Sequence, residues 1–215
     1  MDKIVERVRL NMNANRLPRD MEKYRSMAFD MGASQAKIIQ TSEIPVDERV
    51  ILKCRIPRCF DYGTNANCPP NTLSPSEFRE LLKKYTLALL FIIDVPPEVI
   101  VRGKATINDR VTAYKNVFKI VSKVESQAFY DGHYLAFGLA AGSCRQNYCL
   151  QHENCQALEN KRCRFSLLSR PSMEAVGIDV FRLVAAAGWD IYPIGSAIKP
   201  QHVPKGTLSG IVVVQ

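Results

Sequence analysis

The chain has 215 residues, of which 47 % are hydrophobic and 23 % charged, the balance of an ordinary globular protein. A chain of this length buries enough apolar surface to fold without disulfides, so its seven cysteines are not needed to support a small core. The net charge of +8 permits an anionic ligand or a nucleic acid as partner, but the basic residues are scattered, which disfavours a dedicated nucleic-acid face.

The N-terminal part of the chain predicts one helix and two strands. Apolar residues recur on one face of residues 19–31, which predicts a helix. Residues 36–40 and 49–54 are rich in β-branched and apolar residues and are separated by a turn at Pro45, which predicts two strands. We expect the second strand to end at Cys54.

The middle of the chain predicts a capped helix, a buried strand and a long helix. Ser74 or Ser76 can cap a helix that ends near Tyr85. Residues 86–95 form a continuous apolar run, which is typical of a strand buried on both faces. Residues 109–129 carry one apolar stripe at helical spacing, the strongest helical pattern in the chain.

The C-terminal part predicts three more strands and a helix. Residues 134–142 read as a buried strand that ends just before Cys144. Residues 171–188 predict a helix that ends at a glycine, and residues 191–197 and 208–215 predict the last two strands.

Helices that alternate with apolar strands predict an α/β fold. We expect a mixed, partly parallel sheet with helices packed on it and two cysteine-rich loops at strand ends. We expect residues 1–215 to form a single domain, with metal-binding loops at 54–70 and 142–165. Because ligands bind beyond the carboxyl ends of strands in such sheets, the two loops are expected to share one edge of the fold.

The cysteines favour metal or redox chemistry over disulfides. The N-terminus lacks the apolar region of a secretory signal, and the longest apolar run, residues 87–95, is too short to span a membrane, so we expect a cytoplasmic protein without a membrane partner. Clustered cysteines in that compartment are more often metal ligands or redox groups than disulfides. Seven is also an odd number, which leaves one thiol outside any set of disulfides.

The spacing of the cysteines favours an iron–sulfur cluster over zinc. A structural zinc site usually uses tight CxxC or CxxH turns, and the chain has no CxxC. Wide, uneven spacings suit a larger group, and a proline directly after a ligand cysteine, as at Cys68, also occurs in bacterial ferredoxins. The candidate ligands fall into two groups: Cys54, Cys59 and Cys68 in the first, and Cys144, Cys149, Cys155 and Cys163 in the second.

This grouping leaves several arrangements open. The second group can fully ligate one [4Fe–4S] cluster, and the first group would leave one iron of a second cluster open to water, sulfide or substrate. Alternatively, one cluster draws ligands from both groups and the spare cysteines act as redox thiols. Zinc is the alternative metal. His152 lies within the second group and is either a substitute ligand or an ordinary loop histidine.

Positive charge surrounds the cysteines. Cations near an anionic cluster would stabilise it and raise its potential, although exposed loops are often basic in any case. The positive N-terminal end of the predicted helix 171–188 could also face the cluster. The basic residues next to the cysteines are Arg55, Arg58, Arg145, Lys161, Arg162 and Arg164.

Three motifs together resemble a known family. They are CxxxxC followed by CPP, the GSC that contains Cys144, and RPSMEAVGIDV at residues 170–180. This combination resembles the cysteine-rich "predicted metal-binding protein" family of unknown function, common in anaerobic archaea and bacteria, over residues 50–189. The resemblance implies cytoplasmic metal or iron–sulfur binding. Its matched positions are the seven cysteines with Arg164, Arg170, Ser172, Glu174 and Asp179.

Glu174 and Asp179 cannot act as one carboxylate pair, because a spacing of five places them about 140° apart on a helix. Either both residues are functional, or Glu174 is an acidic residue favoured at a helix start and Asp179 is a solvated side chain.

The sequence thus supports an iron–sulfur protein that acts in electron transfer, or in cluster-dependent redox or sulfur chemistry on a small substrate. The partner would be a redox protein or a small molecule. The alternative is a zinc-stabilised module that binds nucleic acid or protein, and a basic chain permits it. A metal-free thiol redox protein is disfavoured by the missing CxxC. Whether the chain is an enzyme stays open.

Overall fold

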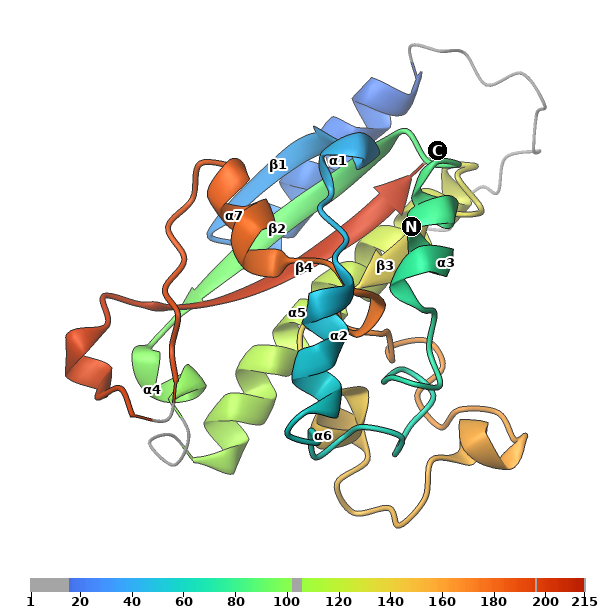
Figure 1. Cartoon of the computed structure of the whole chain (residues 1–215). Helices are drawn as coiled ribbons and strands as arrows, with labels where there is room; N and C mark the ends of the chain where they lie inside the picture. The colour runs from blue at the N-terminus through green and yellow to red at the C-terminus, as the bar shows by residue number, and fades with distance from the viewer. Residues whose placement is uncertain (1–15, 102–105, 196, 215) are drawn as a thin grey trace.

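The computed structural model describes residues 16–101, 106–195 and 197–214. A four-stranded sheet lies at its centre, with helices on both faces (Figure 1). The strands are β1 (Gln35–Gln40), β2 (Leu87–Val95), β3 (Phe137–Leu139) and β4 (Gly206–Val214), in the order β1-β2-β4-β3.

The α/β class is confirmed, but the partly parallel sheet is wrong. Each neighbouring pair of these strands is antiparallel; Gln35 pairs with Ile92, Leu87 with Val214 and Leu139 with Ile211. The long apolar runs that suggested parallel strands have another cause. Both faces of this antiparallel sheet are covered by helices, so its central strands carry apolar residues at successive positions.

The two faces of the sheet are packed by different helices. Helices α1 (Arg16–Asp30) and α5 (Ile107–Tyr130) cover one face, where Leu89 and Phe91 of β2 join the core. Successive side chains of a strand point to opposite faces. Leu90 therefore packs on the other face, which is covered by the helices α3 (Pro75–Leu82) and α7 (Val180–Ala186) and the 3-10 helix η3 (Glu174–Val176).

Several shorter elements complete the fold. They are η1 (Thr41–Glu43), α2 (Glu48–Arg55), α4 (Pro97–Ile100), α6 (Cys144–Tyr148), η2 (Gln156–Glu159) and η4 (Pro200–His202). No helix in the described ranges is long and apolar enough to cross a membrane.

Six of the predicted elements are confirmed: α1, β1, α3, β2, α5 and β4. Ser74 caps α3 as expected, because its hydroxyl accepts the Glu77 N–H. The strand predicted over 134–142 is shortened to β3. Residues 191–195 and 197 are not in a strand, and residue 196 lies outside the described residues.

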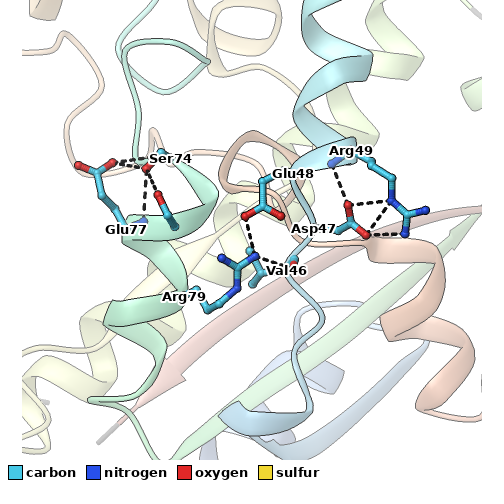
Figure 2. A network of polar contacts seen from close by, with 8 residues as sticks. Val46, Asp47, Glu48, Arg49, Ser74, Glu77 and Arg79 are labelled. Atoms are coloured by element: carbon cyan, nitrogen blue, oxygen red, sulfur yellow. Dashed lines mark hydrogen bonds and ion pairs between the residues drawn. The ribbon is translucent and has the colours of Figure 1, made fainter.

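The strand predicted at residues 49–54 is wrong, because these residues belong to helix α2. Asp47 starts the helix by accepting the backbone N–H of Arg49 at 2.8 Å. Figure 2 shows the network that holds this end, in which Arg79 of α3 donates to Glu48 and to the carbonyl of Val46. Cys54 therefore lies near the end of a helix and not at the end of a strand.

The single helix predicted at residues 171–188 is also wrong, because Gly177 interrupts it. Gly177 has a φ of +90°, which ends η3, and α7 begins only at Val180. Asp179 caps α7 by accepting the Arg182 N–H at 3.0 Å, which accounts for an acidic residue at this position. Within the described residues 164–179, no α-helix begins near Cys163. The expected positive helix end beside the cysteines is therefore not formed there.

Candidate metal centre

Cys144 is placed by a turn and a short helix at the edge of the core. The chain turns after β3 at Gly142, whose φ is +68° and whose position would bring an added Cβ to 2.7 Å from the Tyr114 ring. Ser143 then caps α6 by accepting the Arg145 N–H at 3.2 Å. Cys144, the first residue of α6, is 8 % exposed, and Cys149 follows directly after the helix.

The other two cysteines of the second group are carried by an irregular return of the chain. Cys155 precedes the 3-10 helix η2, and Asn160 ends that helix in the left-handed conformation with a φ of 58°. The Lys161 N–H donates to the Gln156 carbonyl at 3.0 Å and closes the turn. Cys163 is thereby brought back toward α6.

These four cysteines line one cavity of about 210 Å³. Cys144, Cys149, Cys155 and Cys163 all contribute to its wall, with His152 also on the lining. The four cysteines of the second group therefore share one cavity.

Aromatic rings close the side of the cavity that faces α5. Tyr148 stacks on Phe165 with ring centroids 5.2 Å apart, and both rings line the cavity. Tyr148 also makes an edge contact with the buried Phe118 at 5.4 Å. This stack joins the cysteine segment to the core and gives the cavity an aromatic wall.

The cysteine thiols influence one another electrostatically. Burial raises the pKa of Cys144, and the charges of Cys155 and Cys163 raise it further. Burial likewise raises the pKa of Cys149, together with Cys144 and Cys163, while Arg164 opposes the shift. A raised pKa keeps the thiols of Cys144 and Cys149 neutral, and a metal would have to displace their protons to bind there.

Two asparagines of the first cysteine loop cover Cys144, and the sequence reasoning missed both. Asn67 Nδ2 donates to Cys144 Sγ at 3.4 Å and to Ser169 Oγ at 2.6 Å. Asn65 is 1 % exposed, accepts the Asn67 N–H at 3.0 Å and donates to Ser143 Oγ at 3.4 Å. The pattern Asn-Ala-Asn just before Cys68 is the feature that could have drawn attention to them.

Arg145 ties the two cysteine loops together. Its guanidinium donates to the Thr64 carbonyl at 3.3 Å and to the Glu153 carbonyl at 3.0 Å. Arg164 similarly donates to the Asn154 carbonyl at 2.9 Å. Two of the basic residues noted in the sequence thus hold the loops in place and put positive charge beside the thiols. Figure 1 shows both loops at the end of the molecule where α2 finishes and α6 begins.

The three cysteines of the first group are not brought together as the four cysteines of the second group are. Cys68 Sγ lies 3.8 Å from Ser143 Oγ, and burial raises its pKa to about 11, with Asp61 and Cys144 adding to the shift. Burial also raises the pKa of Cys54, but the neighbouring charges there are Cys59 and Glu174. The group is therefore arranged as a pair, Cys54 with Cys59, and a single cysteine next to Cys144.

Glu174 lies in η3, which packs against α2, and burial raises its pKa.

Among the residues that the structure describes, no three histidine, cysteine, aspartate or glutamate side chains are placed to hold one metal ion.

The comparisons with known proteins agree with a metal site. The model of a family described as predicted metal-binding proteins, DUF2284, matches residues 37–208, which include all seven cysteines. No curated protein and no solved structure matches the chain.

Proposed function

Because the chain belongs to the DUF2284 family of predicted metal-binding proteins, we propose that it binds one [4Fe–4S] cluster and serves in electron transfer. The ligands in this proposal are Cys144, Cys149, Cys155 and Cys163. Such a cluster, when bound, accepts and releases single electrons.

The observation that carries the proposal is the cavity that all four cysteine residues line. Its volume of about 210 Å³ exceeds the roughly 150 Å³ that accommodates a benzene molecule. A lone zinc ion draws its sulfur ligands to about 2.3 Å and leaves no such space between them. Four soft thiolates around a larger space suit a cluster of several iron and sulfide atoms.

The residues around the cavity have roles that fit this assignment. Asn67 donates a hydrogen bond to Cys144 Sγ, and hydrogen bonds to ligand sulfur help to set a cluster's potential. Arg145 and Arg164 lie beside the thiols and offset their negative charge. Tyr148 and Phe165 give the site one aromatic wall.

Electron transfer is favoured over chemistry at an open iron. Four cysteines supply one ligand to each iron of a cubane cluster, which leaves no iron free for substrate. An open second cluster at Cys54, Cys59 and Cys68 remains the sequence prediction, but Cys68 lies beside Cys144 while Cys54 and Cys59 are neighbours. The partner in this proposal is a redox protein in the cytoplasm.

The test is the metal content of protein purified without air. We expect about four iron and four sulfide per chain, no zinc, and an EPR signal on reduction. Cys149→Ser, which changes a half-buried loop residue, should lower iron and sulfide sharply, whereas the matched change Cys59→Ser should leave both unchanged. Zinc without sulfide would overturn the proposal and favour the binding module. Iron near eight would restore the second cluster.

A further inference from the structure

The first cysteine loop contains two thiols that the proposed cluster does not use. Cys54 is the penultimate residue of α2, and Cys59 follows it after a turn. The Cys59 N–H donates to the Cys54 carbonyl at 2.9 Å, which closes the five-residue spacing into one turn. Standard backbone bond lengths then keep the two α-carbons within about 7 Å of each other. That separation meets the distance condition for a disulfide, which also requires the two side chains to point toward each other.

The side chains of the pair are also neighbours. After burial, Cys59 and Glu174 are the neighbours that raise the pKa of Cys54, whereas Asp61 and Cys144 are the neighbours that raise the pKa of Cys68. The pair is therefore separate from Cys68. Both of its sulfurs are free thiols in the structure.

The two thiols differ in exposure in the way that a disulfide-exchange pair requires. Cys59 is exposed and Cys54 is half-buried, so an incoming molecule reaches Cys59 first. Two apolar side chains flank Cys59: Phe60 is 88 % exposed and Ile56 is 73 % exposed. Exposed apolar side chains beside a reactive group favour a protein surface over a small, hydrated molecule as the partner.

We propose that Cys54 and Cys59 form a reversible dithiol–disulfide couple that exchanges with an exposed disulfide of another protein. The Cys59 thiolate attacks one sulfur of the partner's disulfide, and the partner's other sulfur leaves as a thiol with the proton that Cys59 lost. Cys54 then gives up its proton and attacks the Cys59 sulfur of the mixed disulfide, which releases the second partner thiol. Two electrons and two protons pass from the pair to the partner, and the reverse exchange restores the dithiol.

The test uses the full chain reconstituted with iron and sulfide, kept free of air and exposed to one of two oxidants. One arm uses insulin as a protein disulfide and the other uses oxidised glutathione. Free thiols are then alkylated, and the chain is digested with trypsin, which releases Cys54 in residues 54–55 and Cys59 in residues 59–79. Cys68 lies in the same peptide as Cys59, so the matched variant Cys68→Ser is treated alongside to assign the bond.

We expect the loss of two alkylatable thiols and a cross-link between residues 54–55 and 59–79 in both the native chain and Cys68→Ser. Cys54→Ser should trap the mixed disulfide on Cys59, and Cys59→Ser should abolish the exchange. The protein disulfide should react faster than glutathione. The proposed couple is wrong if no cross-link forms or if the cross-link requires Cys68. A faster reaction with glutathione than with insulin would contradict the proposal that the partner is a protein.

Iron and sulfide are measured on the same samples. If Cys54→Ser and Cys59→Ser lose iron, the pair ligates metal and the proposed couple is wrong. If every variant lacks iron and sulfide but the cross-link forms, the cluster proposal has failed and the couple stands. The two proposals are therefore judged by separate measurements.

Discussion

Arg170 and Glu125 form a two-point ion pair where three segments of the chain meet. Arg170 Nη2 lies 2.6 Å from Glu125 Oε1, and Nε lies 2.9 Å from Oε2. Glu125 Oε2 also accepts the Gly138 N–H at 2.6 Å. An added Cβ at Gly138 would lie 2.8 Å from the same oxygen, so the strand approaches the carboxylate this closely because residue 138 is glycine.

This contact fixes the end of the second cysteine loop. Arg170 also donates to the carbonyls of Ser166 and Ser169, so its guanidinium holds the chain just after Cys163 against α5 and β3. Both side chains of the ion pair are mostly buried, at 15 % and 19 % exposure. Removal of either side chain leaves the charge of the other unpaired in a partly buried environment.

Glu125→Gln should lower the free energy of unfolding by about 1–3 kcal/mol, because the substitution breaks a charge-assisted, partly buried pair. Urea denaturation of the variant measures this loss. The matched control is Glu80→Gln, which removes the exposed pair with Lys83 and should cost less than about 1 kcal/mol. Equal losses in the two variants would mean that burial of the Arg170 pair contributes nothing.

Asn67→Ala should lower the reduction potential of the reconstituted protein, because the Asn67 N–H to Cys144 Sγ favours the more negative, reduced state. We expect a shift of at most about 59 mV, which corresponds to a tenfold change for one electron. A redox titration followed by EPR measures it. Asn116→Ala removes an amide that donates to the Met31 carbonyl in another part of the fold, and should leave the potential unchanged. The same shift in both variants would contradict the assignment.

Asp47 should make the start of α2 sensitive to acid. Hydrogen bonds from the side chain and backbone of Arg49 lower the pKa of Asp47 from 3.8 to about 2. A lowered pKa in the folded state adds stability that is complete above the unfolded pKa and is lost as the pH falls through the folded pKa. The loss therefore falls between about pH 4 and pH 2.

NMR titration of the Asp47 carboxyl measures this value directly. In Arg49→Gln, we expect the pKa of Asp47 to return toward 3.8, because the strongest hydrogen-bond donor is gone. Lys83→Gln, whose ammonium pairs with Glu80 instead, should leave the Asp47 titration unchanged. An Asp47 pKa near 3.8 in the unsubstituted protein would refute the cap contact seen in Figure 2.

The long elements of the fold could be predicted because their patterns are strong. The apolar stripe of α5 and the continuous apolar run of β2 identify a helix and a fully buried strand. Strand direction could not be predicted in this way. An apolar run indicates that both faces of the strand are covered. The same run is found whether the neighbouring strands are parallel or antiparallel.

The short segments failed where a cap or a glycine outweighed the apolar pattern. In α2 the residues Val50, Ile51 and Leu52 suggested a strand, but Asp47 starts a helix there and Arg79 holds its first turn. In residues 171–188 the apolar spacing suggested one helix, but Gly177 adopts a positive φ and divides it. Gly177 also packs on Pro75, where an added Cβ would lie 2.8 Å away, a contact distant in sequence.

The candidate site was found only in part from its sequence. The cysteines could be grouped by spacing, and the second group does share a cavity. The division of the first group into Cys54 with Cys59 and a separate Cys68 depends on how two loops pack, which spacing does not encode. Asn65 and Asn67 were missed for the same reason, because they reach Cys144 from 77 or more positions away.

That separation along the chain divides the proposed site into two parts. All four proposed ligands lie within residues 144–163, so a metal centre can begin to form on this stretch by itself. The amides of Asn65 and Asn67 reach Cys144 only once the earlier loop has folded against α6. The proposed ligands and their cover therefore come from two separate stretches of the chain, so the proposed centre is shielded only when both stretches are folded.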